Sequence, residues 1–231
     1  RVRRQRQMCI RDRNYYTNEE ITIPLDPTQT PGENAQRYFA KYNKQKRTFE
    51  ALTELIQETA DDIQYLESIS NALDIALSEA DLAQIKEELM QSGYIRRKHT
   101  KKKVKLTSKP MHYISSDGYD MYVGKNNLQN EELTFSFANG NDWWFHAKGA
   151  PGSHVIVKSG GDELPDRTFE EAGRLAAYYS KNRGADKVEI DYIQKKHVKK
   201  PNGAKPGFVV YYTNYSLVID SDISNIKNVQ D

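Results

Sequence analysis

The side chains best suited to chemistry gather in residues 142–157, which read DWWFHAKGAPGSHVIV. Gly149, Pro151 and Gly152 predict a turn, because glycine and proline mark changes of backbone direction. The segment is therefore predicted to be a strand, a tight turn and a second strand. Stacking and hydrogen-bonding groups surround this turn, namely Trp143, Trp144, His146, Lys148, Ser153 and His154.

Alternation along the first predicted strand separates its rings into two sets. Trp144 and His146 share one face, and Trp143 and Phe145 share the other. One face can then enter a core, while the other presents an aromatic ring, an imidazole and nearby cations to a partner. The arrangement favours a surface that stacks on rings and binds phosphates over a hydrolytic centre.

Other interpretations of these residues stay open. Both tryptophans and both histidines can instead be packed or hydrogen-bonded core residues. A metal site built on His146 and His154 lacks a third ligand of recognisable pattern nearby. The only cysteine is Cys9, in a terminal segment predicted to be poorly structured, which disfavours Cys–His catalysis. We therefore predict no catalytic residue, metal ligand, cofactor or enzyme activity.

Charge is strongly segregated along the chain, although the formal net charge is only +2. Residues 50–88 carry eleven acids and the single base Lys86, whereas residues 96–109 carry eight bases and no acid. An acidic helical segment followed by a basic globular part indicates a polyanionic partner. The alternative for residues 96–109 alone is a solvated linker.

A third basic block, residues 195–205, lies between two predicted strands and contains Pro201, Asn202 and Gly203. These residues predict a flexible, protruding loop. Flexible lysines act as point charges towards phosphates and do not read bases. The cationic residues of this loop are Lys195, Lys196, His197, Lys199, Lys200 and Lys205.

Composition predicts a small core with a long solvated helix, because 37% of residues are hydrophobic, 29% are charged and the mean hydropathy is −0.83. The sequence has no apolar run of spanning length, no secretory hydrophobic region and no disulfide framework. We therefore expect a reducing cytoplasmic compartment and no membrane partner.

The amino-terminal half is predicted to form a helical arm. Residues 1–13 are predicted to be a non-native or disordered start, and residues 14–31 to form a tip with an extended segment at 21–25. A helical arm follows over residues 32–95, in which Ser78 and Asp81 open a second, short helix that ends at Gly93. The long helix carries an apolar heptad seam of Tyr42, Phe49, Leu52, Ile56, Ile63, Leu66, Leu73 and Leu77.

A single helix cannot bury such a seam, so a partner helix is required. The partner is either a second copy of this chain or a missing upstream segment, and the unusual start favours the missing segment.

After a basic linker at residues 96–110, the hydrophobic period changes to two over a domain at residues 111–221, followed by a tail at 222–231. A helix is predicted at 168–183, with a capping box of Thr168 and Glu171. The predicted class is α+β: a long coiled-coil helix, then a mostly antiparallel β-sheet domain with one packed helix. The predicted strands are 113–116, 121–124, 133–138, 143–147, 154–158, 188–194, 208–213 and 215–219.

Basic loops beside exposed rings are typical of RNA-binding sheets, where stacking contributes about 1–3 kcal/mol per base. Trp143 or Trp144, with the neighbouring histidines and Lys148, is the predicted platform. Asn126, Asn127 and Asn130 add amide donors, although each asparagine can also be a turn former.

Several motifs in order resemble the RNA-binding domain of the NFACT family, the RqcH- and NEMF-type factors of ribosome-associated quality control. The motifs are residues 123–127 (VGKNN), Asn130, 133–134, Asp142, 144–146 (WFH), 151–155 (PGSHV) and the basic residues of 199–207. Upstream residues 25–46 and 65–67 resemble the returning arm of the family's middle coiled coil. The likeness covers residues 15–221.

The resemblance implies an RNA-binding part of a factor that binds obstructed large ribosomal subunits carrying peptidyl-tRNA. Such factors recruit alanyl-tRNA and add a C-terminal alanine tail. The implied partners are the large subunit, its rRNA, tRNA and the upstream coiled-coil helix. The implied RNA-binding residues are Lys125, Asn126, Asn127, Trp144, His146, Lys148, Ser153, His154, Lys195, Lys196, His197, Lys199, Lys200 and Lys205. The alternative is an adhesin-like, fibronectin-binding interaction module, a label once given to the same family.

Overall fold

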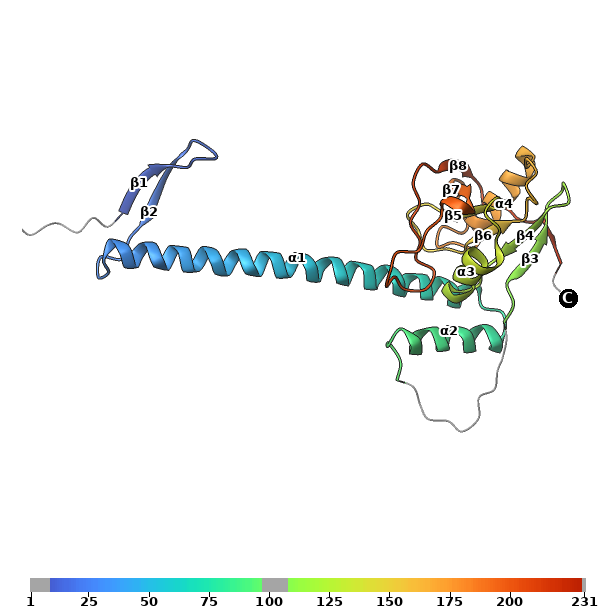
Figure 1. Cartoon of the computed structure of the whole chain (residues 1–231), viewed down its shortest axis with the longest axis horizontal. Coiled ribbons are helices and arrows are strands. Elements are labelled where there is room, and N and C mark those ends of the chain that lie inside the picture. The colour runs from blue at the N-terminus through green and yellow to red at the C-terminus, as the bar shows by residue number, and fades with distance from the viewer. Residues whose placement is uncertain (1–8, 97–107, 230–231) are drawn as a thin grey trace, which may run out of the picture. The chain divides into compact units, whose positions relative to one another are not determined.

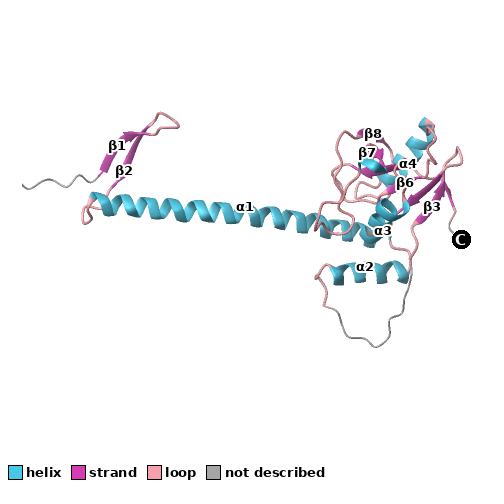
Figure 2. Ribbon diagram, in the orientation of Figure 1, coloured by secondary structure: helices cyan, strands magenta, loops and turns pink. Residues whose placement is uncertain are grey.

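The computed structural model describes residues 9–96 and 108–229, with the elements drawn in Figures 1 and 2. The chain divides into two compact units, Arg1–Asp61 and Asp62–Asp231. Residues 97–107, most of the predicted basic linker, lie outside the described residues. Among the helices of the described ranges, none has the length and hydropathy needed to cross a membrane.

The first unit begins with a two-stranded antiparallel sheet, β1 (Cys9–Arg13) and β2 (Glu20–Pro24). The predicted extended segment at 21–25 is confirmed by β2. The prediction of a disordered start is wrong for residues 9–13, because their backbone pairs with β2. Helix α1 (Pro31–Ile75) follows, and Thr30 and Glu33 cap its start through the Thr30 N to Glu33 Oε2 bond of 2.6 Å.

The apolar seam of α1 is open among the described residues. Tyr42, Phe49 and Ile56 are 60%, 71% and 67% exposed. The prediction that this helix cannot bury its own seam is confirmed, because one face of an isolated helix has nothing to pack against. The remaining seam residues of α1 are also exposed, namely Leu52, Ile63, Leu66 and Leu73, whereas Leu77 is exposed but lies beyond the end of this helix.

The second unit starts with the end of α1 and the short helix α2 (Glu79–Gln91). Tyr65, Ile69 and Ala72 are buried in one cluster with Ile85 of α2. The predicted start of α2 is confirmed, since the Ser78 side chain accepts from Asp81 N and the Asp81 carboxylate accepts from Ser78 N.

A seven-stranded sheet forms the centre of the second unit, in the order β8-β7-β5-β6-β4-β3-β9. Every neighbouring pair is antiparallel, which confirms the α+β class. The strands are β3 (Met111–Ile114), β4 (Asp120–Val123), β5 (Trp143–Ala147), β6 (Val155–Val157), β7 (Val188–Gln194), β8 (Tyr215–Ile219) and β9 (Lys227–Asn228). The last strand lies in the predicted tail, so the sheet extends beyond residue 221.

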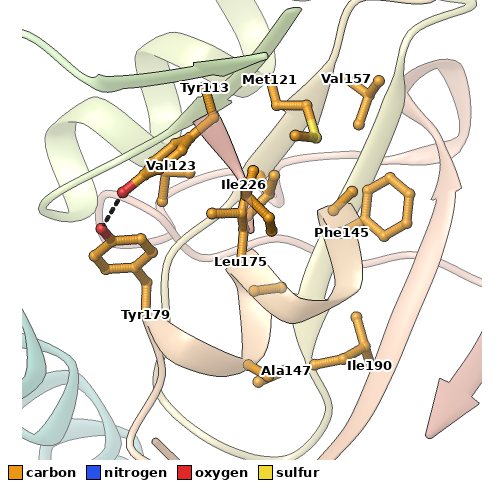
Figure 3. Packing of buried hydrophobic residues seen from close by; sticks show 14 of the residues in the cluster. Tyr113, Met121, Val123, Phe145, Ala147, Val157, Leu175, Tyr179, Ile190 and Ile226 are labelled. Atoms are coloured by element: carbon orange, nitrogen blue, oxygen red, sulfur yellow. Dashed lines mark hydrogen bonds between the residues drawn. The ribbon is translucent and has the colours of Figure 1, made fainter. Parts of the chain in front are cut away.

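Both faces of this sheet are covered at its centre. On one face, Leu175 of α4 (Asp166–Tyr178) packs with Phe145 and Met121, and Tyr113 and Tyr179 join their hydroxyls at 2.5 Å (Figure 3). On the other face, residues of β5, β6 and β7 pack against the segments that follow α3 and β7. These buried residues are Trp144, Ile156, Ile193, Leu133, Ala138 and Val198.

One predicted strand is wrong because the chain is helical there. Residues 133–138 form the π-helix η1 (Leu133–Phe137), which continues from α3 (Asn127–Glu132). Asn126 starts α3 by accepting a hydrogen bond from Gln129 N at 2.9 Å. The alternating apolar residues of LTFSF imitate a strand, but the asparagine cap upstream has already set a helical backbone.

Two further predictions are corrected. Residues 208–213 form no strand and make only the isolated bridge between Lys199 and Val210. Thr168 and Glu171 lie inside α4 and do not cap it. Their side chains bind the β3–β4 turn instead, because Glu171 Oε2 accepts from Ser116 N at 2.7 Å and Thr168 Oγ1 donates to Asp117 Oδ2 at 2.8 Å.

Candidate nucleic-acid interface

The β5–β6 hairpin forms as predicted, but its indole ring is inaccessible. Trp144 is fully buried, with its ring 4.9 Å from Tyr211 and 5.1 Å from His154 between centroids. The prediction of an exposed stacking platform at Trp144 is therefore wrong. The physical reason is coverage, because η1 and residues 198–211 lie over this face. Trp143 points to the other face and packs edge-on against Phe169 at 4.9 Å.

Of the two histidines of the hairpin, His154 is buried and His146 is partly buried beside it. Burial lowers the pKa of His146 to about 4, against opposing effects of Gly152 and Asp191. Burial, followed by the neighbouring His146, holds the pKa of His154 well below its usual range. The His154 ring is fixed through Nδ1 and Thr134 Oγ1 at 2.8 Å. Both imidazoles are therefore neutral at pH 7 and offer no positive charge to a phosphate.

The side chains around the hairpin form no metal-binding cluster among the described residues. Within residues 9–96 and 108–229, no group of three or more His, Cys, Asp or Glu side chains is arranged to hold an ion.

The predicted contacts of the VGKNN motif are made inside the chain. Lys125 Nζ lies 3.2 Å from Asp81 Oδ1, and Asn126 Nδ2 donates to Gln84 Oε1 at 2.8 Å. The side chains of Lys125, Asn126 and Asn127 are all buried, so they contribute no exposed RNA-binding surface. They instead join α2 to the sheet.

Asn127, the last residue of the VGKNN motif, bonds to two side chains that are far away in sequence. Its Nδ2 donates to Glu88 Oε1 at 2.9 Å and to Ser68 Oγ at 2.7 Å. Burial raises the pKa of the Glu88 carboxyl, against the hydrogen bonds from Asn127 and Tyr65. The backbone approaches closely here as well, since a Cβ on Gly207 would lie 2.8 Å from Asn127 Oδ1.

Two more predicted residues at the β5–β6 turn have partners of their own. Ser153 is buried, and its N–H donates to Tyr179 O at 2.9 Å. Lys148 is exposed and forms an ion pair with Glu189 on β7. The hydrogen bond to Glu189 raises the pKa of Lys148, which stays cationic on the surface.

The basic loop is anchored rather than protruding, which corrects the prediction of a flexible loop. It begins with the 3-10 helix η2 (Lys195–His197), and Lys199 N donates to Val210 O at 2.9 Å. Lys200 Nζ lies 2.7 Å from Glu131 Oε2. Lys205 forms an ion pair with Asp62 of α1 and lies 4.6 Å above the Tyr65 ring.

The lysines at the start of the loop have a different environment. Lys196, His197 and Lys199 are exposed, and Lys195 is partly exposed. In the described part of the chain, no acid forms an ion pair with any of these four side chains. The predicted basic surface therefore divides into a start that is free to meet phosphates and an end, Lys200 and Lys205, that binds the chain itself.

A row of residues crosses the sheet on the face that contains Trp144. The strand register aligns one residue from each of five neighbouring strands, in the order His112, Tyr122, Ile156, Trp144 and Ile193. The last three are buried, whereas His112 and Tyr122 are partly exposed. We call this set the cross-sheet row.

The open end of the row was missed from the sequence. His112 stacks on Tyr122 with centroids 4.6 Å apart and planes 2° apart, and Phe137 meets Tyr122 edge-on at 4.7 Å. The Lys158 ammonium lies 4.8 Å from the Phe137 centroid. Alternation along residues 111–114 and 120–123 could have located these rings in the sequence. It places His112 and Tyr122 on the face opposite to the buried residues of the same strands, namely Met111, Tyr113, Met121 and Val123.

Family comparison divides the chain between residues 108 and 109, just before β3, whereas the two compact units meet at Asp61 and Asp62. The profile for the NFACT N-terminal and middle domains matches residues 3–108, and the profile for the NFACT protein RNA-binding domain matches residues 109–213. Together the two profiles match residues 3–213 and leave residues 1–2 and 214–231 unmatched.

Curated relatives are longer proteins. The chain is 46% identical over 218 residues to the Rqc2 homolog RqcH of Streptococcus pneumoniae serotype 2, covering 94% of this chain and 39% of that protein. It is 42% identical over 220 residues to the Rqc2 homolog RqcH of Bacillus subtilis, covering 92% of this chain and 38% of that protein. The chain thus spans about two fifths of the length of these relatives.

A solved structure extends the likeness to three dimensions. The C-terminal part of the fibronectin/fibrinogen-binding protein from Streptococcus suis is 44% identical, with a TM-score of 0.78, over 86% of this chain and 80% of that chain. Sequence motifs, domain profiles and fold agree, so the chain belongs to the NFACT family.

Proposed function

We propose that this chain is the RNA- and ribosome-binding part of an RqcH-like quality control factor and carries no catalytic centre of its own. The RNA-binding domain profile over residues 109–213 and the RqcH relatives support the assignment. The single observation that carries it in the structure is the free basic surface of Lys195, Lys196 and Lys199. Lysines without an acid partner are available as point charges for phosphates.

The finer proposal rests on the family resemblance of the sequence motifs. The full-length factor binds large ribosomal subunits that hold a peptidyl-tRNA, recruits alanyl-tRNA and directs C-terminal alanine tailing. A ribosomal partner would place the protein in the cytoplasm. In this arrangement the present chain contributes contacts to tRNA or rRNA.

The exposed seam of α1 fits a partner helix in the coiled-coil arm of the full-length factor. Tyr42, Phe49 and Ile56 recur every seven residues, which is the spacing that one helix presents to another. Pairing would remove these rings and branched chains from water.

Binding of the whole chain to tRNA and to isolated large ribosomal subunits, measured across a salt series, tests the function. Affinity is expected to fall steeply with salt, because each single-stranded phosphate contact contributes about 0.7 to the slope of log K against log salt. Changing Lys195, Lys196 and Lys199 to Gln together should weaken binding and reduce the slope by about 2.

A matched control removes three exposed lysines elsewhere, Lys44, Lys86 and Lys187, by the same change to Gln. This control should keep most of the affinity, because it alters net charge equally but spares the loop. Absent binding, a flat salt dependence, or an equal loss in both triple variants would contradict the proposed function.

The Streptococcus suis relative is called a fibronectin/fibrinogen-binding protein, and its name raises binding of fibronectin or fibrinogen as one alternative for this chain. Binding of this chain to immobilised fibronectin at physiological salt, resistant to competing RNA, would support that alternative. Binding that RNA displaces would instead reflect the basic surface.

A further inference from the structure

We infer that the open end of the cross-sheet row is a binding site for unpaired bases of single-stranded RNA. The site consists of the rings of His112, Tyr122 and Phe137, which we call the ring ladder, flanked by Lys158 and the start of the basic loop. This inference rests on the proposed function and locates its contact surface. It replaces Trp144, which lies further along the same row and is covered.

The ring ladder is built by three elements that hold their rings in a fixed arrangement. His112 of β3 and Tyr122 of β4 are direct cross-strand partners, so their stacking follows from the sheet register. Phe137 is the last residue of η1, which Ala138 N closes by donating to Leu133 O at 2.9 Å. A preorganised surface of this kind loses little conformational entropy when a base stacks on it.

The rings of the ladder are more exposed than the other residues of the cross-sheet row. Phe137 is 42% exposed, and His112 and Tyr122 are partly exposed, whereas Trp144 and Ile156 are fully buried. An exposed phenylalanine beside a stacked pair offers apolar, flat surface to water. Bases provide the complementary flat surface, and their stacking on protein rings tolerates any sequence.

Cations lie at the edge of the ladder. Lys158 Nζ is held between the Phe137 ring and Asp142 Oδ2, which is 2.5 Å away. The backbone then brings the basic loop to the same turn, since Lys195 N donates to Asp142 O at 2.8 Å and Lys196 N donates to Gly140 O at 3.0 Å. Lys195 Nζ also lies 5.9 Å from the Phe135 centroid, next to Phe137 in η1.

Two of the acids near the ladder have partners within the chain. Asp120 Oδ1 lies 2.7 Å from His112 Nε2 and fixes that ring, and Asp142 is buried against Lys158. Glu132, at the end of α3, is exposed. Lys195 and Lys196 have no ion-pair partner among the described residues, so they are available to phosphates that pass beside stacked bases, and Lys158 keeps its cation against the Phe137 ring. Cations beside exposed rings are the combination typical of single-strand binding.

The combination favours single strands over duplexes. In a duplex the bases stack on each other and offer a protein ring no free face, so only the lysines would contribute. In a single strand both the ring ladder and the lysines would contribute. The inferred ligand is therefore single-stranded RNA, bound without strong sequence preference.

Fluorescence anisotropy with the whole chain tests the site, using a labelled twelve-nucleotide single-stranded RNA and the duplex of the same sequence. Phe137→Leu and Tyr122→Leu keep apolar volume but remove the aromatic face. Each is expected to weaken single-strand binding about tenfold, with duplex binding and the salt slope nearly unchanged. Tyr215→Leu is the matched control, because Tyr215 is 60% exposed and stacks on Tyr192 on the opposite face of the sheet.

Single-strand affinity that stays at the wild-type value in both ladder variants overturns the site but leaves the proposed function intact. The ladder surface would then belong to a protein partner. Failure of the wild-type chain to bind any RNA at low salt overturns both. An equal loss for duplex and single strand overturns the site as well, because the rings would then act through the fold.

Photocrosslinking provides a second measurement that needs no substitution. RNA of the same length carrying 5-iodouridine is expected to crosslink to the ring ladder, since this chemistry favours stacked aromatic side chains. Crosslinked peptides that contain residues 112, 122 or 137 support the site. Crosslinks confined to other peptides contradict it.

Discussion

The two ends of the cross-sheet row carry similar side chains but have opposite surroundings. At one end Trp144 lies with His146 and His154 under η1 and residues 198–211. At the other end His112 and Tyr122 stack in the same way but are partly exposed, and Phe137 beside them is exposed. Ring composition therefore does not decide which aromatic cluster can bind a base. The segments that cover the sheet decide it.

The largest expected effect is a loss of stability when Trp144 at the covered end is replaced. Trp144→Ala should lower the free energy of unfolding by about 3–5 kcal/mol, because it removes the largest fully buried side chain and leaves a cavity. Urea denaturation followed by circular dichroism measures this change. A loss below about 1 kcal/mol would mean that the indole is not a core residue.

The second effect concerns protonation of the covered end. His146 has its folded pKa lowered from 6.5 to about 4 by burial, so the unfolded chain binds more protons between these values. Stability is therefore fully present above pH 6.5 and is lost as pH falls towards 4, by up to about 3 kcal/mol. Urea denaturation at a series of pH values measures this loss.

His146→Gln is the matched variant, because it removes the titrating group and keeps a polar side chain. It should reduce the pH dependence in the window from 4 to 6.5, and the part that remains is expected to come from His154, whose pKa is lowered as well. Identical pH profiles for the variant and the wild-type chain would contradict the burial of this ring.

The smallest effect concerns residues 198–211, which cover Trp144. Lys205→Gln breaks the ion pair with Asp62 and the contact with Tyr65, which anchor the segment over the covered end. We expect a stability loss below about 1 kcal/mol, because both charged groups are partly solvated. Hydrogen exchange should rise in residues 198–211. Lys196→Gln is the comparison, and it should weaken RNA binding more than Lys205→Gln, whereas the reverse order would return Lys205 to the RNA surface.

Local patterns in the sequence predicted most of the elements. The ranges of β7 and β8 and the capping box of α2 were all predicted correctly, because alternation and capping chemistry are local. The seam of α1 was equally visible, because seven-residue periodicity needs no tertiary information.

The errors arose where distant segments meet. The asparagines of VGKNN were predicted to bind RNA, but Asn127 binds Glu88 and Ser68, both far away in sequence. Thr168 and Glu171 have the spacing of a cap, yet they bind the β3–β4 turn. Likewise, no local pattern shows that residues 198–211 cover Trp144 fully while Tyr122 stays partly exposed. Polar side chains satisfy one another across the fold, and only the assembled structure shows which remain available.

One experiment compares the two ends of the row through Phe137→Leu and Trp144→Phe, and it measures both stability and affinity towards single-stranded RNA. Phe137→Leu should weaken RNA binding about tenfold and leave stability nearly unchanged. Trp144→Phe should lower stability by about 1–2 kcal/mol and leave the RNA affinity of the folded chain unchanged. The opposite pattern, with RNA affinity lost at Trp144 and retained at Phe137, would contradict the account.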